Sequence, residues 1–444
     1  MITSVYWQVR RFARRFWVRV TLISCLAILA AVLSPLSHFL PFSLKAEIDE
    51  ESLDDLLSIL TNSMLTVTTF SLSIMVSSHL AADGNATPRA HRLLREDGRT
   101  QTVIATFIGA FIYALTMTVM LNLGFFEQDN YGMIYLVTVG VLALLVVAML
   151  RWVAHLAGLG SIEATIGRVE ESAIASLKAR CAYPFLGARP LSEAEIPEDA
   201  AVFHSKRFGY IQNIDTNRLN ECASDWATRI FVSVSPGDWV GAGDPLGQVD
   251  LETLDEEQEN AIYAAIAIGD QQDYDQDAIF SLVVLAEIAE RALSPGINDP
   301  RTGIDVVSRL TRMIGEMPPE RPIDPPTAPA VYCPPLDMRQ MLLSTLDPIA
   351  RDGRAFVEVQ IAVQKAYALL SRHRDPDLAE AAVALSARAL SYAREGIPVI
   401  EDLQRLAAVA PADYLAETTA SEPSRRVSSL LGDERQMNIE RSDG

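Results

Sequence analysis

The stretch that decides the fold is LLSILTNSMLTVTTFSLSIMVSSHLAA, residues 56–82, which contains no Lys, Arg, Asp or Glu. Three more uncharged runs accompany it, at residues 20–44, 100–126 and 130–150. A helix needs about 20 apolar residues to cross roughly 30 Å of hydrocarbon, and in lipid it must satisfy its own backbone hydrogen bonds. The sequence therefore predicts a domain of four transmembrane helices in residues 1–160.

The charges that flank these runs predict how the chain is oriented. The segment before the first run and the loop between the second and third are rich in arginine, namely Arg10, Arg11, Arg14, Arg15, Arg19, Arg89, Arg92, Arg95 and Arg99. The loop after the first run is acidic. Because Lys and Arg mark the cytoplasmic side of short loops, we expect a multi-pass protein of the bacterial inner (plasma) membrane with both termini cytoplasmic.

The remaining 284 residues are acidic and are expected to be cytoplasmic. Residues 1–160 hold 11 Lys or Arg and 11 Asp or Glu, so residues 161–444 carry the whole net charge of −20. Such a charge repels nucleic acid, which is not an expected partner. The four cysteines have no paired spacing, which fits a reduced compartment better than disulfides or a zinc site.

Periodicity divides this half into four parts. Residues 161–199 are predicted to form a linker helix, over 161–180, followed by a loop. Residues 200–252 are predicted to form a small β-rich module and residues 253–412 a helical domain. Residues 413–444 are predicted to be a disordered tail. In the helical domain we expect one helix over EEQENAIYAAIAIG (256–269), others over 277–293 and 302–316, a Pro-rich loop at 317–335, and two or three helices between 337 and 409.

Within the β-rich module, Gly237-Asp238-Trp239-Val240 precedes Gly243-Asp244-Pro245-Leu246. This turn-and-strand pattern is similar to the barrel-sandwich hybrid of biotinyl and lipoyl domains, so a β-barrel-like module is expected. A carrier domain needs a lysine on an exposed hairpin, and the nearest one, Lys206, stands in a different context. We therefore interpret the barrel as structural and expect no cofactor.

The segment SPGINDP, residues 294–300, predicts a sharp corner between two helices. Asn298 or Asp299 would cap the second helix, and Pro300 suits its first turn. One interpretation is a rigid corner. The other is a site for a phosphate or carboxylate at the helix N-terminus, with these candidate residues: Glu287, Arg291, Asn298, Asp299, Arg301 and Thr302.

No pattern predicts catalysis or a metal. The acidic string Asp270, Asp273, Asp275 and Asp277 lacks the glycine and the closing glutamate of an EF-hand, so helix capping is favoured. No nucleophile elbow, HExxH or phosphate-binding loop occurs. We expect a protein that is not an enzyme.

The uncharged run at 56–82 has a hydroxyl stripe. Its members recur every three or four residues: Ser63, Thr66, Thr69, Ser73 and Ser77. Such a stripe allows close packing between helices; alternatively, in an oligomer, it lines a water-filled path. The spans lack Asp, Glu, Lys and Arg, which argues against a proton-coupled transporter.

Three stretches carry a family resemblance: DQDAIFSLVVLAEIAERALSPGINDPRTGIDVVSRL (275–310), FGYIQNID (208–215), and the region from FSLSIMVSSHLAADGN to FIYAL (70–115). Over roughly residues 10–410 the chain resembles a family of bacterial membrane proteins catalogued as domain of unknown function 2254. Where that family often has an Arg-rich segment, this chain has the acidic run 269–277. The resemblance implies an architecture and no established activity.

Two functional hypotheses follow. The first is a homo-oligomeric, channel-like conduit in which the hydroxyl stripe lines the path and the cytoplasmic half assembles or gates it. The second is a membrane-anchored scaffold or sensor that binds a protein or a small anionic ligand through its helical domain. The expected partners are membrane lipid, further copies of the chain, and ions or a small anion.

Overall fold

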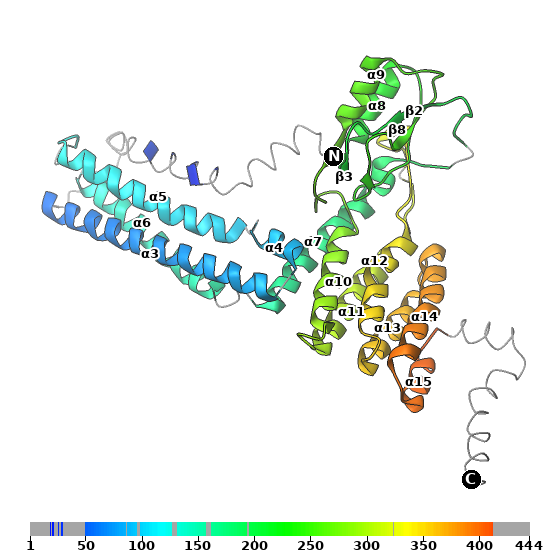
Figure 1. Ribbon diagram of the computed structural model, residues 1–444. Coiled ribbons are helices and arrows are strands. Elements are labelled where there is room, and N and C mark those ends of the chain that lie inside the picture. Colours follow the sequence, from blue (N-terminus) through cyan, green and yellow to red (C-terminus); the bar gives the residue numbers. More distant parts are fainter. Residues whose placement is uncertain are drawn as a thin grey trace, which may run out of the picture. The chain divides into compact units, whose positions relative to one another are not determined.

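The computed structural model describes residues 49–85, 87–95, 98–126, 131–156, 161–192, 195–322 and 324–411, with six isolated positions between residues 18 and 29. The chain divides into two compact units, Met1–Arg168 and Val169–Gly444, whose elements Figure 1 labels. Apart from the isolated positions, the predicted first span lies outside the described residues, and so does the predicted tail at 413–444.

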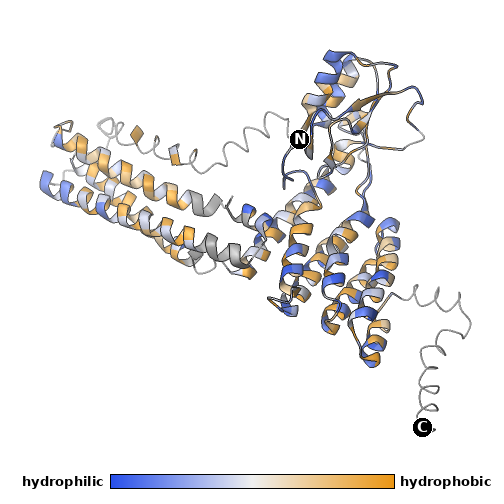
Figure 2. Cartoon of the chain, viewed as in Figure 1, coloured by the Kyte–Doolittle hydropathy of each residue, from blue (hydrophilic) through white to orange (hydrophobic). Residues whose placement is uncertain are grey.

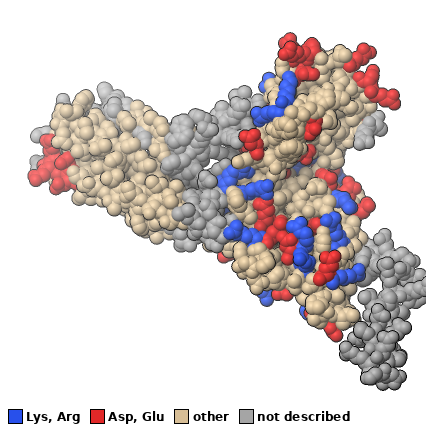
Figure 3. All heavy atoms as spheres, viewed as in Figure 1, with Lys and Arg blue, Asp and Glu red and all other residues tan. Residues whose placement is uncertain are grey.

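The first unit contains four described helices: α3 (Glu50–Asn85), α4 (Pro88–Arg95), α5 (Gly98–Asn122) and α6 (Tyr131–Leu156). Among the described residues, three segments are long and apolar enough to cross a membrane: Glu50–Ser77, Thr102–Asn122 and Ile134–Val153. They correspond to the second, third and fourth predicted spans. Figure 2 shows apolar residues along these helices, and Figure 3 shows little charge on them except acidic groups at one end.

One face of α3 packs against α5 and α6. Its buried side chains include Leu53, Leu57 and Leu60, which belong to one apolar cluster with Phe107 of α5 and Ile134 of α6. A buried hydrogen bond also joins α3 to α6, because the indole Nε1 of Trp152 donates to Ser71 Oγ over 2.9 Å. In lipid, where no water is present, such a bond gives the buried indole N–H its hydrogen-bond partner.

Helix α7 (Ile162–Ala182) coincides with the predicted linker helix, and its residues from Val169 onward belong to the second unit. A short 3-10 turn, η3 (Pro184–Gly187), follows it and leads into the first strand. The second unit then builds a β region and a group of helices.

Two sheets form the β region. The five-stranded sheet has the order β1 (Ala188–Pro190), β8 (Ala328–Cys333), β4 (Ile230–Val232), β6 (Pro245–Val249) and β2 (Ala201–His204). The three-stranded sheet has the order β5 (Trp239–Val240), β3 (Gly209–Ile214) and β7 (Ile266–Gly269). Strand β8 pairs in parallel with β1 and β4, and the other pairs are antiparallel.

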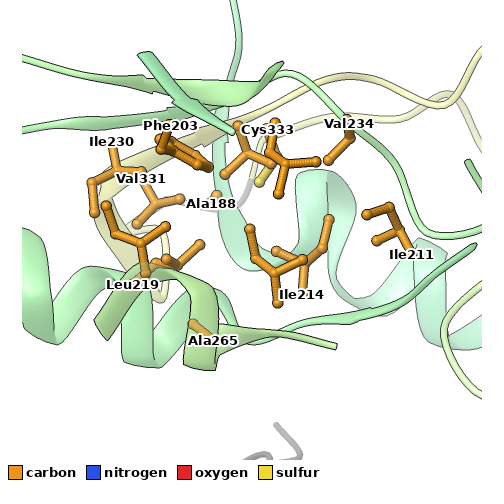
Figure 4. Packing of buried hydrophobic residues seen from close by; sticks show 14 of the residues in the cluster. Ala188, Phe203, Ile211, Ile214, Leu219, Ile230, Val234, Ala265, Val331 and Cys333 are labelled. Atoms are coloured by element: carbon orange, nitrogen blue, oxygen red, sulfur yellow. The ribbon is translucent and has the colours of Figure 1, made fainter. Parts of the chain in front are cut away.

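The two sheets share one core with the helices α8 (Thr216–Asp225) and α9 (Glu256–Ala265). Figure 4 shows Phe203 and Val331 of the larger sheet, Ile214 of the smaller one, Leu219 of α8 and Ala265 at the end of α9 around this core. The packing of apolar residues from separate elements into one cluster is what holds the β region together.

This arrangement corrects four predictions. Among the described residues the strands pair as two open sheets, so the expected barrel-like module is not found. The β region also extends beyond the expected bounds of 200–252, because β1, β7 and β8 join its sheets. The predicted helix over 256–269 ends at Ala265, since Ile266 and Ile268 pair with β3, and the predicted Pro-rich loop contains β8.

The remaining helices form a packed group: α10 (Phe280–Leu293), α11 (Pro300–Gly315), α12 (Met338–Asp352), α13 (Val357–Leu370), α14 (Pro376–Gly396) and α15 (Ile400–Ala407). Four of them, α12 to α15, lie where two or three helices were expected. Helix α10 is largely buried, and its Leu282, Leu285 and Ile288 are fully buried. The group therefore has an apolar core of its own.

Candidate functional site

The hydroxyl stripe lies on the exposed face of α3. All five of its members, Ser63, Thr66, Thr69, Ser73 and Ser77, are exposed in the described structure. The buried residues of the same helix lie on the opposite side of its circumference, because successive residues turn by about 100°. The stripe therefore does not pack against α5 or α6.

The threonine hydroxyls of the stripe have partners within their own helix. Thr66 Oγ1 donates to the carbonyl oxygen of Asn62 over 3.0 Å, and Thr69 Oγ1 donates to Leu65 O over 3.0 Å and lies 2.9 Å from Thr66 O. These bonds use the hydroxyl hydrogen of each threonine. The hydroxyl oxygen can still accept a hydrogen bond from a group outside the helix. The five stripe residues are thus polar and uncharged.

The corner at 294–300 is held by its own groups. Asp299 Oδ1 accepts from the backbone N–H of Arg301 at 3.1 Å and of Thr302 at 3.2 Å, and its Oδ2 accepts from Thr302 Oγ1 at 2.6 Å. The hydrogen bond from the Thr302 hydroxyl is the main reason that the pKa of Asp299 is lowered. Asn298 takes a positive φ of 56°, and its N–H donates to Ser294 O.

The anion site at this corner therefore stays a prediction, and the rigid corner is the interpretation that these hydrogen bonds favour. The N–H groups of Arg301 and Thr302 that were assigned to a ligand already bind the Asp299 carboxylate. Of the other candidates, Glu287 and Arg291 are half-buried on α10 and Asn298 is exposed. Arg301 also lines the cavity described next.

That cavity is a groove between α11 and α13 with a volume of about 1130 Å³. Its floor is mostly apolar and includes Ile304, Val307, Ile361, Ala362 and Leu369. The two helices lie with their C-terminal ends together, since His373 Nε2 lies 2.8 Å from Met317 O. The groove is hereafter called the α11–α13 groove.

Five cations and two carboxylates line the groove: Arg301, Arg312, Lys365, Arg372, Arg374, Glu316 and Glu358. Four of the cations, all except Arg312, are exposed and make no ion pair with any described residue. In a chain with a net charge of −20, this is a local excess of positive charge. Sequence reasoning missed it because residues 301–316 and 358–374 are far apart in the chain and neither segment has a distinctive motif.

Arg312 connects the groove to α7. Its guanidinium and that of Arg309 both bind the carboxylate of Glu170, whose side chain is only 9% exposed. Arg309 is also paired with Asp305 at 2.8 Å. A buried carboxylate held by two guanidinium groups fixes the position of α7 on α11.

Two further contacts fasten α7. Ser281 Oγ of α10 lies 3.1 Å from Ser172 Oγ. Arg180 Nε donates to Glu320 Oε1 over 2.7 Å, and the Glu320 carboxylate also accepts from the backbone N–H groups of Phe185 and Leu336. The part of α7 that follows Val169 is therefore bound along its length to the helical group and to the segment before β8.

The acidic string before α10 acts as a cap. Asp277 Oδ1 accepts from the N–H groups of Ile279 at 2.9 Å and Phe280 at 3.0 Å. The pKa of Asp277 is raised to about 7, chiefly by burial and to a smaller extent by the nearby charges of Asp238 and Asp273, while these two hydrogen bonds lower it. Among the described residues no group of three His, Cys, Asp or Glu is arranged to hold a metal ion.

Comparison with known proteins gives a family match. A family model described as "Predicted membrane protein (DUF2254)" matches residues 13–368. Uncharacterized proteins of Mycobacterium bovis and Mycobacterium tuberculosis are 31% identical over 120 residues, which cover 26% of this chain and 23% of each relative. The match thus spans about a quarter of the length of these curated relatives. No solved structure matches the chain.

Proposed function

Because the chain belongs to the predicted-membrane-protein family DUF2254, we propose that it is a homo-oligomeric, channel-like conduit of the bacterial inner membrane. In this proposal the hydroxyl face of α3 lines the path. The cytoplasmic half assembles or gates the ring. Both termini are cytoplasmic in this proposal, an orientation that the flanking arginines favour.

The observation that carries the proposal is the exposure of all five hydroxyl residues on the side of α3 opposite its buried face. Lipid hydrocarbon offers a row of hydroxyl groups no hydrogen-bond partner. Another protein surface or water does offer such partners. A second copy of the chain, or several around an axis, would supply such surroundings. Uncharged hydroxyl oxygens around a pore would favour weak selectivity.

The contacts of α7 supply a route for gating. Residues of α7 from Glu170 to Arg180 are tied to α10, α11 and the segment at Glu320. A rearrangement in the helical group would therefore move α7 as well. No enzymatic step is part of the proposal.

The experiment is ion flux through liposomes that contain the purified full-length protein. We expect flux that falls when Thr69 and Ser73 are both replaced by Leu. Leu72→Met, on the same helix but off the stripe, serves as the matched control and should leave the flux unchanged. Absence of flux from the wild-type protein in all salts would overturn the proposal.

A second candidate function is a membrane-anchored sensor of an anionic ligand. The observation that favours it is the α11–α13 groove, which has four cations without an ion-pair partner in the part of the chain that the structure describes. A sensor would bind its ligand whether or not the membrane half conducts. Ligand binding by a protein that shows no flux would select this function over the conduit.

A further inference from the structure

We propose that the α11–α13 groove binds an amphipathic anion, a small molecule with an apolar chain and a phosphate or carboxylate head group, and that the head group competes with Glu170 for Arg312. The proposal rests on the sensor function stated above and names its site and ligand class. It does not depend on whether the membrane half conducts.

The size and lining of the groove favour a small amphiphile. Its volume, about 1130 Å³, lies just above the range of roughly 300–1,000 Å³ that is usual for small-molecule pockets. Ile304, Val307, Ile361 and Leu369 give it an apolar floor, and Leu369 is 62% exposed although it is a large apolar residue. An apolar chain on this floor would remove that surface from water.

The cations determine the charge of the ligand and the position of its head group. Arg312, Lys365, Arg372 and Arg374 line the groove near the C-terminal ends of the two helices, where Glu316 is the opposing charge. Lys365, Arg372 and Arg374 have no ion pair among the described residues. A phosphate or carboxylate at this end would be complementary in charge, and guanidinium groups bind such anions in a fork geometry.

Arg312 gives the binding event a consequence elsewhere in the fold. Its side chain is 56% exposed in the groove while it binds the buried carboxylate of Glu170 on α7. An anion in the groove would compete with Glu170 for this guanidinium. Glu170 would then be paired with Arg309 only. Ligand binding would thereby weaken the attachment of α7 to α11, and by reciprocity a weaker attachment would strengthen ligand binding.

The test uses the full-length protein in phosphatidylcholine nanodiscs, with dodecyl phosphate as the probe, equilibrium dialysis as the measurement and empty nanodiscs as the background. We expect saturable binding that weakens with added salt, is much weaker for butyl phosphate and is negligible for inorganic phosphate. The double variant Arg372→Glu, Arg374→Glu should bind about tenfold more weakly, because two exposed attractions become repulsions.

Matched controls separate the site from general charge effects. Arg339→Glu reverses an exposed arginine on α12 outside the groove and should change the affinity by less than about twofold. Glu170→Gln frees Arg312 and should tighten binding about threefold, whereas Asp305→Asn removes one of the two partners of Arg309, leaves Arg312 paired with Glu170 and should not tighten binding. Thermal unfolding of each variant checks that the fold is kept.

Three outcomes overturn the proposal. The first is binding that is equal for dodecyl phosphate and inorganic phosphate. The second is binding that the double reversal leaves unchanged. The third is binding that appears only after residues 412–444 are removed, which would assign the groove to that segment of the chain. Loss of flux in liposomes without loss of dodecyl phosphate binding would count against the conduit and leave this inference standing.

Discussion

The Asp277→Asn substitution should change how the stability of the second unit depends on pH. Asp277 is 5% exposed, and burial is the main reason that its pKa rises from an ordinary 3.8 to about 7. Asp238 and Asp273 add negative charge nearby. Asparagine keeps the oxygen that accepts from the N–H groups of Ile279 and Phe280, but it does not ionise.

The sign of the effect follows from proton binding. Between pH 4 and pH 7 the folded unit keeps a proton on Asp277 that the unfolded chain has lost, so stability falls as pH rises through this window. One pKa unit corresponds to about 1.4 kcal/mol, so the loss on reaching pH 8 is at most about 4 kcal/mol. This loss of unfolding free energy is complete above pH 7, and it is absent below the pKa of Asp277 in the unfolded chain.

The assay is denaturant unfolding of the full-length protein in detergent at pH 5, 6, 7 and 8, followed by Trp fluorescence; Trp226 and Trp239 lie in the β region. We expect the wild-type free energy of unfolding to fall between pH 5 and pH 8 and that of Asp277→Asn to fall less. Asp375→Asn changes a comparable capping carboxylate, on α14, and should keep the wild-type slope. Parallel curves for wild type and Asp277→Asn would refute the reasoning.

Three further substitutions test the packing that positions the sites. Ser71→Ala leaves the buried indole N–H of Trp152 without its acceptor and should lower the melting temperature of the membrane unit, with a cost of about 1–2 kcal/mol. Glu320→Gln removes the carboxylate that fastens the end of α7 and should cost about 3 kcal/mol in denaturant unfolding. Gly247→Ala would place a methyl group against the carbonyl oxygen of Phe231, so we expect lower soluble yield and, by denaturant unfolding, a loss of about 1–3 kcal/mol.

The elements that sequence reasoning predicted well are those with a local cause. Residues 100–126 and 130–150 read as spans because uncharged length is itself what a membrane requires, and α5 and α6 occupy them. The helix cap at 298–299 could be predicted for the same reason, since Asp before Pro is a local signal for the start of a helix. The structure adds the hydrogen bonds of that cap.

The elements that were missed depend on partners far away in the chain. The alternation Ile266-Ala-Ile268-Gly followed a helical run and was read as part of it, but pairing with β3 makes it a strand. The segment 328–333 lies among prolines and becomes β8 because β1 and β4 flank it. Non-local pairing of this kind leaves little trace in a local pattern.

The candidate sites divide in the same way. The hydroxyl stripe could be predicted from the spacing of its residues. The structure adds that these residues lie on the exposed face of α3. The α11–α13 groove could not be predicted, because the two helices that line it come together only after α12 has connected them. For the corner the sequence left two interpretations open, a rigid turn and an anion site, and in the structure the Asp299 carboxylate binds the backbone N–H groups of Arg301 and Thr302.

The central claim, that the hydroxyl face of α3 lines a water-filled path, is tested most directly by thiol accessibility. Single cysteines are placed at residues 63, 66, 69, 73 and 77, and at 65 and 72 as controls, in a protein whose four native cysteines are replaced. A membrane-impermeant methanethiosulfonate is then applied to the protein in membranes. We predict reaction at the five stripe positions and none at the two controls; equal protection of all seven would contradict the account.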